Sequence, residues 1–384
     1  MPSQQSDTVK TFFSLLRSGL YDTPLQEAEL PESIDWSAIA KLARKHVVAG
    51  PVIEAVRLLP DRLRPTAEVR DKMDKAVVGL IRMSMIMDKT AARLAMFLSQ
   101  HGVEGVLLKG PGVARYYRTP QMRQSGDIDF YVGGRLYKKA LALCMEKLVE
   151  DKNTCSETAQ HFDFIMQGVT VELHRRASRM YSPINNRRFQ KWSTSELECS
   201  PRRRTIIVND VEVTLPSYDF DAVYIFYHAW CHYIGGGIGL RQLCDWAMIF
   251  YSHTDDIDVK KLKETVVSLG LTKGWKLFAS IVVRHLGVPG HMIPLYDPAY
   301  DKKSEKVLAD ILAGGNFGYY SEAYEKALKR KSFLGRGLGK FNVATRKLVS
   351  LFPIIPVEAT LLYFNHLVIG TIRYSKRSMR KPVG

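Results

Sequence analysis

The stretch that decides the fold is residues 105–133, GVLLKGPGVARYYRTPQMRQSGDIDFYVG. A short apolar run ends in Lys109-Gly110, a basic loop rich in Gly and Pro follows, and a second apolar run begins at Asp127. Side chains of a strand alternate between its two faces, so Asp127 and Asp129 are predicted to share one face while Ile128 points into a core. Two carboxylates this close repel each other unless a cation lies between them. The stretch therefore predicts a strand suited to divalent metal and phosphate chemistry.

A third carboxylate comes from residues 169–174, VTVELH, whose alternation predicts a strand with Thr170, Glu172 and His174 on its polar face. Residues 161–166 alternate in the same way, so the two runs are predicted to form a β-hairpin around Gln167-Gly168. If the second run pairs beside the Asp127–Asp129 strand, three carboxylates converge on one surface.

Those three carboxylates, Asp127, Asp129 and Glu172, are the predicted metal ligands and catalytic residues. Mg²⁺, or Mn²⁺ in its place, prefers few carboxylates together with phosphate oxygens. One ion would activate an attacking hydroxyl and a second would stabilise a triphosphate. Glu172 could also accept the proton of the acceptor.

Phosphate needs positive charge and backbone N–H groups that face outward. Lys109-Gly110 ends a predicted strand just before a short helix, whose N-terminal amides are suited to an anion. Arg123, four residues before Asp127, can reach the same rim and contact phosphate oxygens. Lys109, Gly110 and Arg123 are therefore predicted to bind the nucleotide. The alternative for Lys109 is that it only caps a strand end, and the alternative for Arg123 is a structural ion pair.

His228 and His232 lie four residues apart on one face of a predicted helix, as zinc-binding pairs do. Position 229 is Ala rather than the Glu of HExxH, which excludes a zinc-protease site. The two histidines are predicted to shape the nucleotide side of the cleft, with a purely structural role as the alternative. Arg241 and Asp245, also four apart, are expected to form a pair on the helix surface.

Taken together, these residues resemble the bacterial "uncharacterised nucleotidyltransferase" family of the polymerase-β-like superfamily. The resemblance rests on Leu108-Lys109-Gly110, Arg123, Asp127-Ile128-Asp129 and Glu172-Leu173-His174, followed by the blocks 228–232 and 240–245. It implies Mg²⁺-dependent transfer of a nucleoside monophosphate from an NTP to an acceptor. The acceptor stays open: a small molecule, a peptide, a protein or RNA.

Hydrophobic periodicity places this core between two helical regions. The predicted fold is α/β (α+β): a small mixed β-sheet nucleotidyltransferase core flanked by N-terminal and C-terminal helical regions. The predicted divisions are a helical region 1–100, the core 101–216, a helical domain 217–319 and a basic helical tail 320–384. Smaller predictions are an N-cap at Asp35, a hairpin that turns at Asn209-Asp210, and a long loop with some helix over 175–204.

Composition limits the other possibilities. The 384 residues carry a formal net charge of +16, which favours anionic partners such as nucleotides, nucleic acid or acidic membrane surfaces. Five scattered cysteines form no CxxC pair, so a structural zinc site is not expected and a reducing compartment is favoured. The N-terminus lacks the pattern of a signal peptide, so the chain is predicted to be cytoplasmic.

The tail suggests a further partner. Residues 320–384 contain 13 Lys and Arg against three Glu, and 348–372 are apolar but interrupted by polar residues. A packed terminal helix is expected there, with an interfacial helix as the alternative and peripheral contact with an acidic membrane as its consequence. Two rival functions follow: a non-catalytic nucleotide- or RNA-binding protein on the same fold, and a basic membrane-surface partner in surface-polysaccharide or peptide assembly.

Overall fold

The structure is a computed structural model. It describes residues 2–25 and 31–320, together with 326, 329, 342–343, 345, 348–353, 355–357 and 359–364. The helices are α1 (Pro2–Tyr21), α2 (Trp36–His46), α3 (Ala49–Val56), α4 (Ala67–Gln100), α5 (Pro111–Ala114), α6 (Gly133–Lys147), α7 (Pro183–Thr194), α8 (Tyr218–Gly235), α9 (Leu240–His253), α10 (Val259–Ser268), α11 (Thr272–Leu286) and α12 (Asp301–Gly314). The strands are β1 (Val106–Leu107), β2 (Asp127–Tyr131), β3 (Ser156–Glu157), β4 (His161–Met166), β5 (Val169–His174), β6 (Arg204–Val208) and β7 (Val211–Leu215). The predicted fold class, a small mixed sheet with helical flanks, is confirmed.

The sheet that carries the carboxylates has five strands in the order β1-β2-β5-β4-β3. β2 and β5 run parallel at its centre, and the remaining pairs are antiparallel. Asp127 lies opposite Thr170 and Asp129 lies opposite Glu172 in the β2–β5 register. The condition for convergence of the three carboxylates, pairing of the two strands that bear them, is therefore met.

Both predicted hairpins form, because their turn residues adopt the positive φ angles that two-residue hairpin loops need. Gln167-Gly168 joins β4 to β5 and Asn209-Asp210 joins β6 to β7, with all four residues at φ between 47° and 72°. The predicted N-cap is also present, since the carboxylate of Asp35 accepts a hydrogen bond from the backbone N–H of Ala38. Residues 175–204 hold more helix than expected, namely α7 and a π-helical turn, Ser195–Cys199.

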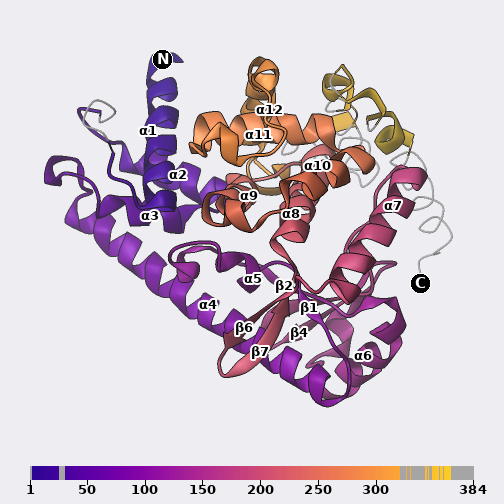
Figure 1. The fold of residues 1–384 in the computed structure, drawn as a ribbon. Helices are drawn as coiled ribbons and strands as arrows, with labels where there is room; N and C mark the ends of the chain where they lie inside the picture. The colour runs from indigo at the N-terminus through magenta and orange to yellow at the C-terminus, as the bar shows by residue number, and fades with distance from the viewer. Residues whose placement is uncertain are drawn as a thin grey trace, which may run out of the picture.

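Two hydrophobic cores organise the described residues. One core joins α1, α2 and α3 to α8 and the helices after it, and it contains large fully buried rings such as Trp246 and Trp275. The other fills the space between α4, the five-stranded sheet, α6 and the β6–β7 hairpin. Figure 1 shows α4 running beneath β6 and β7, with α8 to α12 gathered above the sheet. The predicted divisions at residues 100, 216 and 319 stay predictions.

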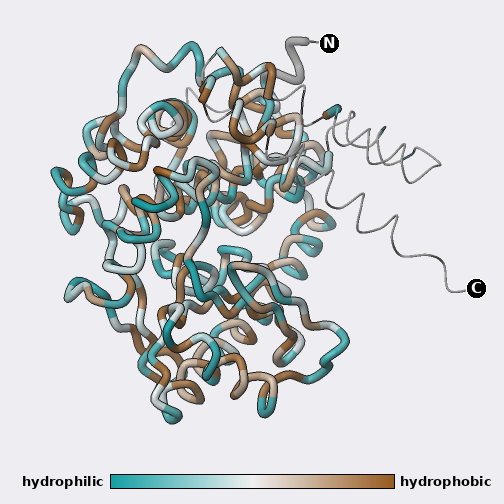
Figure 2. Tube along the Cα trace, turned by 90° about the vertical axis from the view of Figure 1, so that its right-hand side faces the viewer, coloured by the Kyte–Doolittle hydropathy of each residue, from teal (hydrophilic) through white to brown (hydrophobic). Residues whose placement is uncertain are grey.

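Several helices, such as α2 and α10, bury one face, whereas α8 and α9 are buried on most of their surface. Polar and apolar segments accordingly alternate along the chain in Figure 2. No helix among the described residues combines the length and apolar character that crossing a membrane requires.

The tail beyond residue 320 lies largely outside the described residues. Within its described part, Leu348, Leu351, Ile355, Ala359 and Leu362 are buried in the first core.

Candidate functional site

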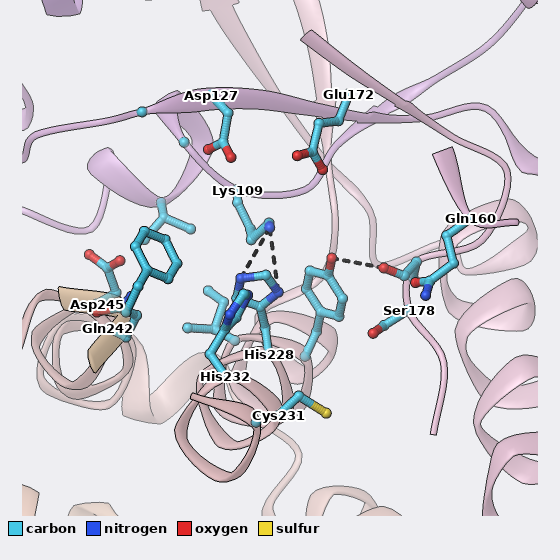
Figure 3. Close-up of a pocket in the computed structure, with 18 of the residues that line it drawn as sticks. Lys109, Asp127, Gln160, Glu172, Ser178, His228, Cys231, His232, Gln242 and Asp245 are labelled. Atoms are coloured by element: carbon cyan, nitrogen blue, oxygen red, sulfur yellow. Dashed lines mark hydrogen bonds between the residues drawn. The ribbon is translucent and has the colours of Figure 1, made fainter. Parts of the chain in front are cut away.

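A cavity of about 870 Å³ opens between the sheet and helices α8 and α9. Its lining includes seven of the eight predicted site residues: Lys109, Gly110, Arg123, Asp127, Glu172, His228 and His232. Figure 3 shows Asp127 and Glu172 pointing from the sheet into one space, with Lys109 beside them and the two histidines facing them from α8. The tertiary fold thus gathers residues that are more than a hundred positions apart.

Asp129, the eighth residue, lies behind this surface. Its side chain is fully buried, and its Oδ1 atom accepts from Lys109 Nζ at 2.8 Å and His174 Nε2 at 3.0 Å. Burial alone would raise the pKa of Asp129, but these two cationic donors hold the pKa far below its ordinary value. Its Oδ2 atom is buried and has no hydrogen-bond partner among the described residues.

Lys109 supplies the cation that the two adjacent aspartates require. Burial disfavours the ammonium, yet Asp129, Tyr224, Asp127 and Glu172 outweigh it and raise the pKa of Lys109. The pKa of Asp127 is raised by its own burial and by the neighbouring Asp129. The ammonium therefore stays charged in the midst of three carboxylates, at the position where phosphate was predicted to bind.

His174 adds a second donor; the sequence placed it beside Glu172, either to orient that carboxylate or as an ordinary histidine at the end of a strand. Its Nε2 lies 3.0 Å from Asp129 and 3.1 Å from Glu172 Oε2, while its Nδ1 lies 3.3 Å from the carbonyl oxygen of Arg176. Burial opposes protonation, but the two carboxylates raise the pKa of His174 to about 9. The potential ligand atoms of His161, Glu172 and His174 lie within 4.8 Å of one another. Among the described residues, this group has that spacing and the trio Asp127, Asp129 and Glu172 does not.

His228 and His232 remain neutral. The His228 ring nitrogens lie 3.3 and 3.4 Å from Lys109 Nζ, and the His228 and His232 rings meet edge to face at 4.4 Å. Burial and the Lys109 ammonium lower the pKa of His228 well below its ordinary value and that of His232 to about 4. Neutral imidazoles can accept or donate hydrogen bonds beside a phosphate without adding charge.

Arg123 has a fixed partner in the structure. It is buried and forms a two-pronged ion pair with Asp245, through Nε to Oδ1 at 3.0 Å and Nη2 to Oδ2 at 2.7 Å. Tyr117 donates a further hydrogen bond to Asp245 at 2.7 Å. Asp245 is therefore part of a buried bridge between the loop before β2 and α9, and the expected surface pair of Arg241 with Asp245 is wrong. The phosphate role of Arg123 stays a prediction.

Arg241 is, with Arg179, one of two arginines that line the cavity and that the sequence did not single out for binding. Its Nη1 donates to the carbonyl oxygen of Gln124 at 2.9 Å, and its Nε is buried without a hydrogen-bond partner among the described residues. It lines the cavity with Asp127, and burial together with Arg123 lowers its pKa. The position of Arg241 in the cavity could have been predicted from its place on the helix only if the orientation of α9 toward the sheet had been known.

The residues fit a divalent cation on two observations. Asp127 lines the cavity and forms no ion pair among the described residues, whereas Lys109 contacts Asp129 and His174 contacts both Asp129 and Glu172. The unpartnered Oδ2 of Asp129 is a buried carboxylate oxygen, the type of ligand that Mg²⁺ prefers.

Comparison with known proteins identifies the family of this chain. Residues 32–287, about two thirds of the chain, match the model of a family described as uncharacterised nucleotidyltransferases. The matched range includes all eight predicted site residues. No curated protein and no solved structure matches the chain. On the extent of that match, the chain belongs to the uncharacterised nucleotidyltransferase family.

Proposed function

We propose that this protein transfers a nucleoside monophosphate from an NTP to a hydroxyl or phosphate of an acceptor, at the cavity between β2, β5 and α8. The observation that carries the proposal is the meeting of Asp127, Glu172 and Lys109 at one cavity wall. A mere anion site gains nothing from clustered negative charge, whereas a site for a metal-bound triphosphate needs both signs.

Each residue has a part that follows from its position. Asp127, Asp129 and Glu172 would hold Mg²⁺, which when bound supplies charge neutralisation of the triphosphate and activation of the attacking oxygen. Lys109 would exchange part of its contact with Asp129 for a phosphate oxygen, since its ammonium already faces the cavity. Glu172 would accept the proton of the acceptor. Arg241, with Gly110, would bind the phosphates on the α9 side.

The two flanks of the cavity suit the two substrates. In Figure 3, Gln242 and Asp245 of α9 stand on one side of the carboxylates, and Gln160 and Ser178 stand on the other side. Arg241 lines the cavity from the same helix as Gln242, and Arg179 lines it next to Ser178. Phosphoryl transfer needs the attacking and leaving oxygens roughly in line across the phosphorus atom. We therefore assign the α9 flank, where Arg241 acts on Asp127, to the triphosphate, and the flank of Gln160, Ser178 and Arg179 to the acceptor.

Asp127→Asn is the sharpest test. Asp127 lines the cavity, whereas Asp129 also holds Lys109 and His174 and its replacement would disturb the fold. The variant is expected to lose at least about a hundredfold in Mg²⁺-dependent turnover while its unfolding curve is unchanged. The measurement is release of pyrophosphate from each NTP, with mass spectrometry of candidate acceptors for nucleotidylated products.

Asp71→Asn on the surface of α4 is the matched control, because Asp71 pairs only with Lys75 in solvent. The rival function, a non-catalytic nucleotide or RNA binder, predicts the opposite sign for Asp127→Asn: removal of a negative charge should tighten anion binding. Full turnover in Asp127→Asn would rule out the proposed role of the carboxylates. The role of the basic tail at a membrane surface stays a prediction.

A further inference from the structure

One end of the cavity is lined by aromatic rings that the carboxylate chemistry does not use. Phe317 and Tyr319, here called the aromatic rim, line the same cavity as Asp127 and Lys109. The Phe317 ring meets the His232 ring edge to face at 5.5 Å, and the Tyr319 ring lies 5.8 Å from Phe317. A row of rings therefore leads from Lys109 through His228 and His232 to the rim.

The rim is held by direct contact between two backbones. A Cβ atom on Gly237 would lie 2.7 Å from the backbone nitrogen of Gly318, and one on Gly318 would lie 2.5 Å from the carbonyl oxygen of Gly236. Gly318 has φ +72°, a conformation that other residues rarely adopt. The loop after α12 can thus lie against the end of α8 only because both segments are glycine there.

Phe317 itself adopts φ +56°, which is unusual for a bulky side chain. Phe317 is 38% exposed although it lines a cavity. A strained backbone conformation thus holds an apolar ring partly in solvent. Strain of this kind gathers at ligand sites, where the surrounding structure imposes it. A half-exposed planar ring is suited to stack on another planar ring.

We propose that the nucleobase of the NTP stacks on Phe317 at the aromatic rim; this inference rests on the proposed function. With the phosphates near Lys109 and Arg241, the base extends away from the sheet, along the His228–His232 face of α8 toward the rim. Every base has a π-face, so such a subsite accepts all four bases with modest preference. Phe317 lies outside the matched range 32–287, so this subsite is a feature of the present chain beyond the shared family core.

The test compares NTP binding with binding of inorganic triphosphate, which has no base. Isothermal titration of the full chain with Mg²⁺ and ATP, CTP or triphosphate is made for wild type, Phe317→Leu, Phe317→Ala and Phe317→Trp. Phe317→Ala and Phe317→Leu are expected to lower the affinity for ATP and for CTP about tenfold and to leave the affinity for triphosphate unchanged. Phe317→Trp keeps a π-face and is expected to bind as tightly as wild type.

Tyr320→Ala is the matched control, because Tyr320 lies in the same loop with its ring toward Lys45 and does not line the cavity. Nucleotide affinity that is unchanged in Phe317→Leu and Phe317→Ala overturns the inference. Equal loss of triphosphate affinity also overturns it, since the loop and not the stacked base would then be responsible. If the wild-type chain binds triphosphate but no NTP, both the stacking of the base and the proposed nucleotidyl transfer are overturned. If it binds NTP but shows no turnover, only the proposed nucleotidyl transfer is contradicted.

Discussion

At the scale of single residues, burial decides which charges the site can keep. Lys109 and Asp129 are both taken out of water, and each keeps its charge because groups of opposite charge surround it, foremost the other member of the pair at 2.8 Å. A buried ion pair of this kind gives little net stability, but removal of one partner leaves an uncompensated charge. The sequence showed that the Asp127–Asp129 pair needs a cation, and the structure shows that a lysine of the same chain already provides one.

His46 carries a pH dependence that belongs to this scale. It ends α2, is fully buried, and has its pKa lowered from 6.5 to about 4 by burial and by the neighbouring Lys45. The unfolded chain therefore takes up a proton on this histidine at a higher pH than the folded chain. The stability that the neutral histidine contributes is full above pH 6.5 and is lost as the pH falls through about 4.

We predict that the free energy of unfolding of wild type falls by about 3 kcal/mol relative to His46→Leu between pH 6.5 and pH 4. Urea denaturation at both pH values measures the difference. His291→Leu, at an exposed histidine, is expected to follow wild type across the whole range. If the His46→Leu and wild-type profiles are parallel, the buried neutral state of His46 is not the cause of acid instability.

At the scale of elements, the short strand β1 is positioned by the residue before it. Gly105 lies over the Phe130 ring of β2: a Cβ atom added to Gly105 would lie 2.1 Å from Phe130 Cε1. Phe130 is buried and lies opposite Leu107 in the β1–β2 pair. Because residue 105 has no side chain, the backbone before β1 can lie against the Phe130 ring, and β1 can pair with β2 and lead to Lys109.

Gly105→Ala is predicted to lower the free energy of unfolding by about 1–3 kcal/mol, since the ring must move within a packed core. Gly79→Ala is the control: Gly79 is exposed in α4 with no atom within 4 Å of an added Cβ, and the change should stabilise by about 0.5–1 kcal/mol. Guanidinium or thermal unfolding measures both. A Gly105→Ala variant as stable as wild type would show that β1 does not lie against Phe130.

At the scale of the whole molecule, the cavity exists because two cores meet there. The Arg123–Asp245 pair and the Tyr117 hydroxyl join the loop before β2 to α9, and Arg241 returns a hydrogen bond from α9 to Gln124. These partners are 117 to 128 residues apart. The bridge fixes the carboxylate wall relative to the wall formed by α8 and α9.

Arg123→Met is predicted to lower the free energy of unfolding by about 3–5 kcal/mol, because Asp245 is left buried and charged without its counterion. Arg123→Met combined with Asp245→Leu removes both charges and should recover part of that loss. Lys75→Met, in the exposed pair with Asp71, should cost less than about 0.5 kcal/mol. The measurement is urea unfolding; a double variant no more stable than Arg123→Met would refute the bridge as an ion-pair contact.

Local physics explains which parts of the fold and of the site the sequence could predict. Alternation in GDIDFYV and VTVELH determined two strands and the face of each carboxylate, because the side-chain period of a strand is two. Turn residues at Gln167-Gly168 and Asn209-Asp210 determined the hairpins, and Asp35 determined a helix start. Asp127 and Glu172 reach one cavity wall, with Asp129 behind it, because the β2–β5 register pairs Asp129 with Glu172 and buries Ile128 and Val171 on the opposite face.

The partner of each charged side chain was decided only by the tertiary structure. Helical α8 is apolar on most of its surface, so its sequence does not say which face turns His228 toward Lys109. The same holds for α9, which directs Asp245 to Arg123 and Arg241 to the cavity, and for the loop that brings Phe317 to His232. These choices depend on how two cores pack against each other, which is a sum over many distant contacts. Sequence alone determined the strands and the carboxylates; packing determined the cation that faces them and the walls of the cavity.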